Sequence, residues 1–179
     1  MTYKECIIQA TDELAKNPKT IFLGYKVKKG RANGTFKNVP EEQLFETPVA
    51  ENLMIGLAIG LSLEGYIPVV YIERFDFILN ALDAIVNHLM KIDSMSNGQF
   101  EPSIILKVAI GFKNKPPYAC ATHIQDFTRS MESLLTFPVI KLKQSDTHIL
   151  KSYKLAEKQA RYKQSIMLIE EKELYDEIV

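Results

Sequence analysis

The chain has 179 residues, of which 46% are hydrophobic and 25% are charged, a composition typical of one globular domain with its own core. Its 22 Lys and Arg residues equal its 22 Asp and Glu residues, which argues against nucleic acid or an anionic membrane as the main partner. Two cysteines do not make a disulfide framework, so a reducing compartment, the cytoplasm, is expected. The longest apolar run, residues 53–63, is too short to cross a bilayer, which takes about 20 residues.

Strand patterns and helix patterns alternate along the chain. The expected strands are residues 20–24, 68–72, 103–110, 139–142 and 165–169, and the expected helices are residues 3–16, 48–65, 76–92, 126–135 and 147–160. This order predicts an α/β fold, a three-layer sandwich with a mostly parallel central sheet and helices on both faces. Ligands in such folds bind outside the carboxyl ends of the strands.

Two long polar segments interrupt this pattern. Residues 25–42 form a loop with Asn33-Gly34 as its turn signal, and residues 111–121 form a loop that contains prolines. Loops of this length in a compact domain are usually functional or mobile.

The helix over residues 48–65 combines small and apolar residues with one acid near its start. Thr47 is expected to cap this helix, with Pro48 at the first helical position, where a missing N–H has no cost. Glu51 is one residue too far from Thr47 for a capping box. It is therefore either a simple partner of the helix dipole, worth about 0.3–1 kcal/mol, or a functional carboxylate. Gly56 and Gly60 leave one face of the helix with almost no side chains, which allows another element to pack closely against its backbone.

Aromatic and histidine side chains supply further candidates. Phe75 and Phe77 lie just after a strand and are either core residues or rings that stack on a planar heterocycle. His123 lies near the end of a loop that follows a strand, and is either a surface histidine or a catalytic one. Nothing else supports a dyad of Cys120 with His123. The three histidines have no ligand spacing that predicts a metal site, and the lysines of residues 141–163 are expected to form a solvated helix face.

These candidates occur in an order that is more specific than any one of them. The series consists of Thr47-Pro48-x-x-Glu51, Gly56-x-Ala58-x-Gly60, Gly65-x-x-Pro68-Val69, Phe75-Asp76-Phe77, Ala81-x-Asp83-x-x-x-Asn87, Lys91, Ser96-x-Gly98-Gln99-x-x-Pro102 and His123-x-Gln125. Over roughly residues 20–170 the chain resembles the pyrimidine-binding domain of thiamine diphosphate enzymes. The closest resemblance is to the beta subunit of the decarboxylating component of 2-oxo acid dehydrogenases, and transketolase shares the domain more distantly.

The resemblance implies roles for individual residues. In this family, the glutamate that matches Glu51 hydrogen-bonds a ring nitrogen of the cofactor's aminopyrimidine and promotes loss of a proton from the thiazolium carbon. Phe77 matches the aromatic residue that packs on the aminopyrimidine, and Phe75 lies behind it. Asn80 stands where the family usually has Gln, near the pyrimidine. His123 matches a catalytic histidine near the reacting substrate.

Several positions depart from the family pattern. Tyr71 replaces a common acid, Glu73-Arg74 replaces a more neutral pair, and Lys107 replaces an arginine. These departures affect the expected substrate more than the contact with the cofactor.

The resemblance also implies a partner. In these enzymes a second domain with a Gly-Asp-Gly motif holds the diphosphate and Mg²⁺, and no Gly-Asp-Gly occurs in this sequence. We therefore expect residues 1–179 to be a single pyrimidine-binding domain, without a diphosphate-binding domain or a transketolase C-terminal domain. Thiamine diphosphate would be shared with a partner chain that carries the Mg²⁺, in a homodimer or heterotetramer. The alternatives are the half-subunit of a transketolase-type carbon transferase, a non-catalytic scaffold of the same fold, and an excised domain.

Overall fold

A six-stranded, all-parallel sheet forms the centre of the molecule, with the strand order β2-β1-β3-β4-β6-β5. The computed structural model describes residues 1–114 and 121–179. The strands are β1 (Thr20–Gly24), β2 (Leu44–Glu46), β3 (Ile67–Ile72), β4 (Ile105–Ile110), β5 (Val139–Lys141) and β6 (Ile166–Glu171). The α-helices are α1 (Tyr3–Ala15), α2 (Glu51–Leu63), α3 (Ile92–Met95), α4 (Thr128–Leu134) and α5 (Asp146–Arg161).

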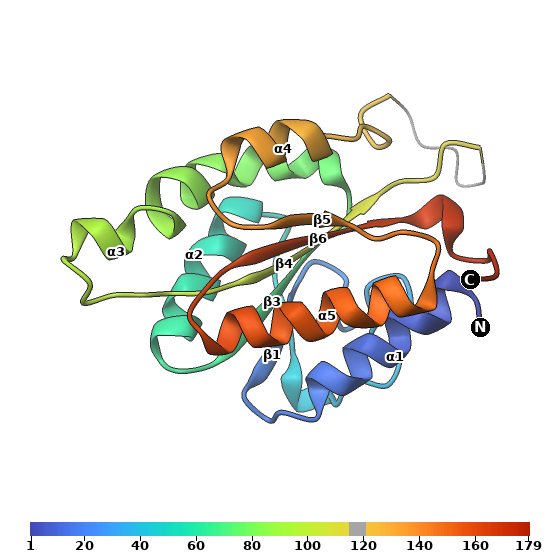
Figure 1. Cartoon of the computed structure of the whole chain (residues 1–179), viewed down its shortest axis with the longest axis horizontal. Coiled ribbons are helices and arrows are strands. Elements are labelled where there is room, and N and C mark those ends of the chain that lie inside the picture. The colour runs from blue at the N-terminus through green and yellow to red at the C-terminus, as the bar shows by residue number, and fades with distance from the viewer. Residues whose placement is uncertain (115–120) are drawn as a thin grey trace.

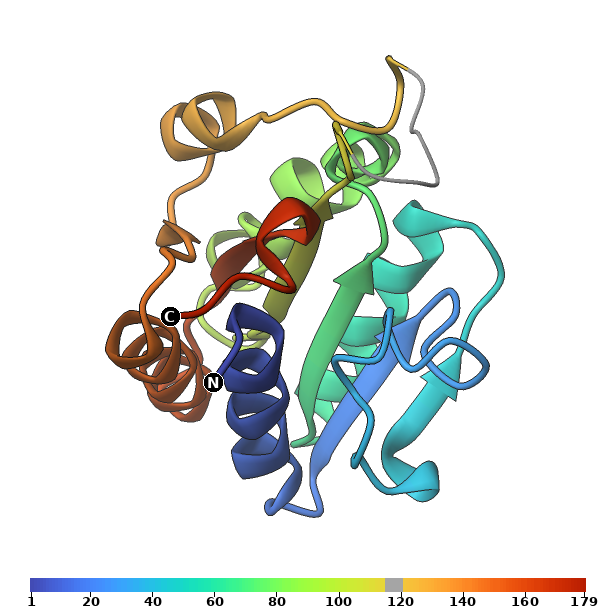
Figure 2. The same ribbon diagram turned by 90° about the vertical axis from the view of Figure 1, so that its right-hand side faces the viewer.

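Helices cover both faces of the sheet, so the predicted three-layer α/β fold is confirmed. Helices α1 and α5 lie side by side on one face, and α2 and α4 lie on the other (Figures 1 and 2). The strand side chains alternate between these two layers: Val69 and Tyr71 of β3 pack with α1 and α5, whereas Val70 and Ile72 pack with α2. Burial on both faces explains why the strands have continuous apolar runs.

The expected start of the second helix is wrong. Helix α2 begins at Glu51 with Ala50 at its N-cap position, and no side chain caps it. The backbone N–H of Thr47 instead donates to the carbonyl of Gly24, so Thr47 extends the pairing of β2 with β1. A residue that precedes proline avoids the helical region, and Pro48 therefore keeps Thr47 extended. No element was predicted for residues 43–46, which form the end of a short 3₁₀ helix, η1 (Glu41–Gln43), and β2.

The expected helix over residues 76–92 is divided into three shorter turns. A 3₁₀ helix, η2 (Phe75–Ala81), is followed by a π-helical turn, η3 (Ala84–Leu89), and then by α3. The buried residues Phe75, Ile78, Ala81 and Ala84 are three apart, which is the period of a 3₁₀ helix rather than an α-helix. The last 3₁₀ helix, η4 (Lys172–Leu174), follows β6.

A buried ion pair connects two neighbouring interior strands, β4 and β6. The ammonium of Lys107 on β4 lies 2.8 Å from Oε1 of Glu170 on β6, and both side chains are almost fully buried. Lys107 Nζ also donates to the hydroxyl of Thr35 at 3.0 Å and lies over the ring of Tyr71. Tyr175 donates its hydroxyl to the same Glu170 oxygen at 2.8 Å. Burial lowers the pKa of Lys107, and the Glu170 carboxylate opposes that shift.

We predict that Lys107→Met destabilises the chain by about 3–5 kcal/mol, because it leaves the Glu170 carboxylate buried without its cation. Lys107→Met combined with Glu170→Met should recover most of this loss. Urea unfolding measures both changes. Lys16→Met, which breaks an exposed 2.7 Å pair with Glu13, is the matched control and should cost no more than about 1 kcal/mol. A loss for Lys107→Met as small as the control's would contradict the structural role of the buried pair.

Candidate cofactor-binding site

Glu51 lies at the start of α2, beside the carboxyl end of the sheet. Its side chain is buried, with 6% of its surface exposed. The Thr47-Pro48 segment runs out of β2 in extended form and delays the helix until Glu51, which becomes its first residue. The first backbone N–H groups of a helix favour a nearby negative charge. Local sequence therefore places a carboxylate inside the protein rather than on the surface.

A cavity of about 140 Å³ adjoins this carboxylate. Apolar side chains from α2, from the segment before it and from the region after β3 form much of its wall. Its lining residues are Tyr25, Val49, Glu51, Met54, Tyr71, Ile72, Glu73 and Phe77. The cavity thus combines flat apolar walls with two carboxylates that can bond a ligand.

Asn80 and Phe77 are both brought to Glu51 by η2. The Asn80 amide Nδ2 donates to Glu51 Oε2 at 3.3 Å. The ring of Phe77 lines the cavity and lies 5.3 Å from the ring of His123, edge to face at 80°. Glu51 and Phe77 thus share the cavity, Asn80 contacts Glu51, and His123 contacts Phe77.

Phe75 lies apart from this group, in the core. Its side chain is fully buried and packs edge to face on Phe127 at 5.8 Å. Phe75 is not among the residues that line the cavity, and its role in cofactor binding stays a prediction.

The loop that carries His123 passes very close to the end of β4. A Cβ atom on Gly111 would lie 2.1 Å from the carbonyl oxygen of His123, so only glycine allows this approach. The hydroxyl of Thr122 lies 2.9 Å from His123 Nδ1. Cys120, which was considered as a partner of His123, lies outside the described residues.

Charged groups surround the cavity on the side of Glu73. Its carboxylate lies 3.4 Å from the Arg74 guanidinium and 3.6 Å from the ammonium of Lys26. Lys172, after β6, is buried, and no described residue accepts a hydrogen bond from its ammonium. Burial, reinforced by the nearby Arg74 guanidinium, lowers the pKa of Lys172 to about 7.

Part of the cavity lining was not predicted from the sequence. Tyr25, Val49, Met54 and Ile72 were not expected at a site, and Tyr71 and Glu73 were noted only as departures from a family pattern. Tyr25 directly follows β1, and Glu73 directly follows β3, so position after a parallel strand was the available signal.

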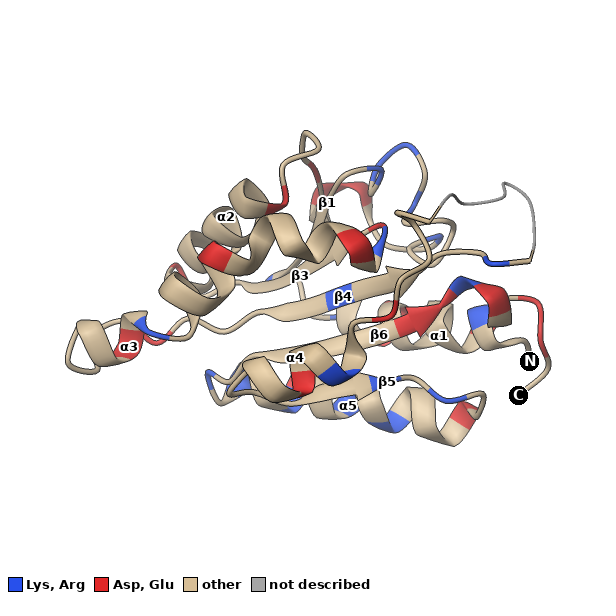
Figure 3. Cartoon of the chain, turned by 90° about the horizontal axis from the view of Figure 1, so that it is seen from above, with Lys and Arg blue, Asp and Glu red and all other residues tan. Residues whose placement is uncertain are grey.

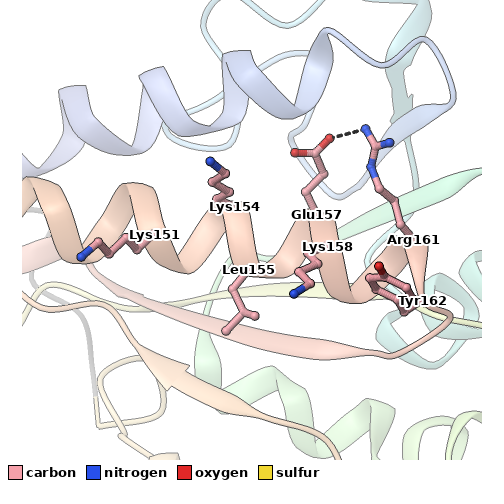
Figure 4. A pocket seen from close by; sticks show the side chains of 7 residues that line it. All are labelled: Lys151, Lys154, Leu155, Glu157, Lys158, Arg161 and Tyr162. Carbon is pink, nitrogen blue, oxygen red and sulfur yellow. Dashed lines mark hydrogen bonds and ion pairs between the residues drawn. The ribbon is translucent and has the colours of Figure 1, made fainter.

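A larger hollow lies far from this site, on the surface of α5. It is open, has a volume of about 720 Å³, and is lined by Lys151, Lys154, Leu155, Glu157, Lys158, Arg161 and Tyr162. Figure 4 shows these side chains fanning outward along one helix, with an ion pair between Glu157 and Arg161 at 2.7 Å. Figure 3 shows the basic segments of α5, whereas the ribbon of α2 is mainly uncharged. The hollow has the character of a solvated helix face, as the lysine pattern predicted.

The described residues, 1–114 and 121–179, contain neither a cluster of metal ligands nor a membrane-spanning helix. Within these ranges no group of three or more His, Cys, Asp or Glu side chains could hold a metal ion. In the same part of the chain, no helix has the length and apolar character needed to cross a membrane.

Comparison with known proteins identifies the family. A family model described as the pyrimidine-binding domain of transketolase matches residues 1–140. The chain belongs to the transketolase pyrimidine-binding domain family. The resemblance seen in the sequence is thereby confirmed.

Relatives of this pyrimidine-binding domain include beta subunits of 2-oxo acid dehydrogenases. The mitochondrial pyruvate dehydrogenase E1 component subunit beta of Chaetomium thermophilum is 33% identical over 134 residues, which cover 70% of this chain and 34% of the relative. The 2-oxoisovalerate dehydrogenase subunit beta of Bacillus subtilis is 29% identical over 119 residues, which cover 62% of this chain and 36% of the relative. The chain thus spans about a third of the length of these relatives.

A solved structure described as the inactive beta4 tetramer of a split gene transketolase has the same fold. The match has a TM-score of 0.66 at 19% identity and covers 93% of this chain and 48% of the other. At this identity the likeness concerns the fold alone.

Proposed function

We propose that this domain is the pyrimidine-binding, beta-type subunit of a split thiamine diphosphate-dependent enzyme that acts on a 2-oxo acid or a related carbonyl substrate. The observation that carries the proposal is the buried carboxylate of Glu51, which faces a small cavity with apolar walls at the carboxyl edge of the sheet. A simple partner of the helix dipole would need neither burial nor a cavity.

The cavity fits the aminopyrimidine ring of this cofactor. Its volume of about 140 Å³ is close to the roughly 150 Å³ of a protein cavity that accepts benzene. Glu51 offers a carboxyl group to a ring nitrogen, and Phe77 offers a flat apolar surface. When bound, the cofactor supplies a carbanion that attacks a carbonyl group and an electron sink for the resulting charge.

The residues of this chain would bind the ring and control one proton. Glu51 would share a proton with the ring nitrogen, in a site from which the apolar walls exclude water. Asn80 would fix the orientation of the Glu51 carboxyl through its 3.3 Å hydrogen bond. Phe77 would pack on the ring with Phe75 behind it, and His123, whose ring lies 5.3 Å from that of Phe77, would act on the reacting substrate.

The substrate class is inferred from the relatives. The curated relatives are named as subunits of dehydrogenases for pyruvate and 2-oxoisovalerate, which supports a 2-oxo acid. A transketolase-type transferase that acts on a sugar is the alternative, supported by the structural neighbour, which is named as a transketolase. Glu51 and Phe77 line one cavity and contact Asn80 and His123 respectively, which supports catalysis over a scaffold that has lost its chemistry.

A partner chain completes the proposal. We infer that residues 1–179 act as one pyrimidine-binding domain and that a partner chain holds the diphosphate and Mg²⁺. The relatives are named as beta subunits, and the beta-only tetramer of the structural neighbour is described as inactive. We further propose that the complex is cytoplasmic.

The first prediction concerns proton transfer by Glu51. Glu51→Gln keeps the shape and hydrogen-bonding capacity of the side chain but removes its titratable proton. In the reconstituted complex, exchange of the thiazolium proton should slow by roughly 10² to 10³, the scale of about 2–4 kcal/mol of transition-state stabilisation. NMR detection of deuterium exchange measures this rate. Glu64→Gln, an exposed change near the other end of α2, is the control. Equal exchange rates in wild type and Glu51→Gln would leave Glu51 as a helix-end charge.

The second prediction concerns the need for a partner. The isolated chain should bind thiamine diphosphate weakly or not at all, because most of the cofactor's charge lies in a diphosphate that the partner holds. Addition of the partner with Mg²⁺ should produce tight binding. Calorimetry with and without each component measures this. Tight, Mg²⁺-dependent binding to the isolated chain would refute the split site.

The third prediction concerns self-association through α2. Leu53, Gly56, Gly60 and Leu63 form one exposed stripe at helical spacing, and a Cβ on either glycine would contact no described atom within 4 Å. An exposed apolar stripe of this kind is typical of a protein interface. We propose that a second copy of this chain packs there, giving a homodimer, or a heterotetramer once the partner binds.

Gly60→Leu tests this interface. It should overpack the contact, at a cost of about 1–3 kcal/mol, and shift the assembly toward monomer. The fold itself should not suffer, because leucine favours a helix more than glycine does by about 1 kcal/mol. Light scattering measures the assembly, with Lys151→Leu on the exposed face of α5 as the control. Normal assembly of Gly60→Leu would place the subunit contact elsewhere.

A further inference from the structure

A side-chain bond connects the loop of His123 to the turn of Phe77. The Gln125 amide Nε2 donates to Asp76 Oδ1 at 2.9 Å, and the Gln125 backbone N–H approaches the same oxygen at 3.4 Å. Gln125 follows His123 by two residues, and Asp76 immediately precedes Phe77. The bond therefore joins the two segments that carry the facing rings of His123 and Phe77.

The Asp76 carboxylate accepts hydrogen bonds from no described residue other than Gln125. Its side chain is buried, with 7% exposed, and its second oxygen, Oδ2, has no hydrogen-bond partner among the described residues. Oδ1 accepts from Gln125, and the side chain makes no capping bond to the backbone of η2. Burial of a carboxylate with so few bonds is unfavourable, so its presence calls for an explanation.

The contact at Gly111 limits how the His123 loop can move. Because the His123 carbonyl passes directly over Gly111, the loop is in contact with the end of β4. The Asp76–Gln125 bond ties the same loop to η2 two residues after His123. Two contacts, one at the His123 carbonyl and one at the Gln125 side chain, restrict the direction in which the His123 ring points.

We propose that Asp76, acting through Gln125, is a positioning residue that holds the His123 ring against Phe77, one of the residues that line the Glu51 cavity. The catalytic role of His123 in this proposal rests on the proposed function. The positioning of the His123 ring against Phe77 does not, because it concerns only this chain. In the proposed reaction, Asp76 touches neither cofactor nor substrate and acts only by keeping His123 in reach of them.

NMR of the isolated chain tests the geometric part without cofactor or partner. An aromatic ring shifts the signals of nuclei above its face, so the contact with Phe77 should displace the ring signals of His123. Histidine-labelled protein gives signals from three histidines, and His123→Gln identifies the relevant one. Phe77→Leu then gives the full size of the shift due to the Phe77 ring.

Three variants decide the proposal. Asp76→Ala and Gln125→Ala should each lose more than half of the shift that Phe77→Leu removes. Asp76→Asn keeps an acceptor oxygen in the same place and should retain most of it. Gln125 is exposed, so Gln125→Ala decides the outcome even if Asp76→Ala does not fold. An unchanged His123 signal in Gln125→Ala, or an equal loss in Asp76→Asn and Asp76→Ala, would overturn the proposal.

Kinetics of the reconstituted complex test the significance for catalysis. Asp76→Ala should lower kcat by about 10- to 100-fold while the affinity for cofactor stays unchanged, and Asp76→Asn should recover most of this loss. Weaker cofactor binding with an unchanged kcat would count against a role through His123. Absence of any thiamine diphosphate-dependent turnover in the wild-type complex would contradict the proposed function, and the NMR result would still stand.

Discussion

The buried pair of Lys107 and Glu170 is the interaction on which the centre of the molecule depends. It joins β4 to β6, bonds the 25–39 segment through Thr35, and anchors the C-terminal segment through Tyr175. The Lys107 ammonium also lies 4.8 Å from the centre of the Tyr71 ring, and Tyr71 lines the Glu51 cavity. Loss of this buried network would strongly destabilise the chain, and the network supports Tyr71, which forms part of the cavity wall.

Parallel strands then account for the position of the site. Their carboxyl ends meet at one edge, where the segments after β1 and β3 and the N-terminus of α2 converge. A carboxylate, an aromatic ring and a histidine from distant parts of the sequence come together there without any of them being adjacent in the chain. The Asp76–Gln125 bond adds a further restriction, between η2 and the loop of His123.

Sequence patterns predicted what depends on short-range order. The alternation of strands and helices indicated the layers of the fold, and the ordered series of motifs that resembles a known family made Glu51 the candidate carboxylate. Phe75, Ile78 and Ala81 are three apart, which is the spacing of a 3₁₀ turn. A regular α-helix was nevertheless predicted there. Thr47 was misassigned as a cap because its backbone N–H finds Gly24, a residue 23 positions away, which no local pattern reveals. The bonds of Asp76 and Lys107 are long-range in the same way.

The central claim is that the cavity beside Glu51 receives an aminopyrimidine ring. Titration of the isolated, isotope-labelled chain with a free 4-aminopyrimidine, followed by NMR, tests it most directly because no diphosphate or partner is needed. The account predicts weak, saturable binding in the millimolar range, with shifts centred on Val49, Glu51, Met54 and Phe77, and loss of these shifts in Glu51→Ala. Shifts centred elsewhere, or binding that survives unchanged in Glu51→Ala, would contradict it.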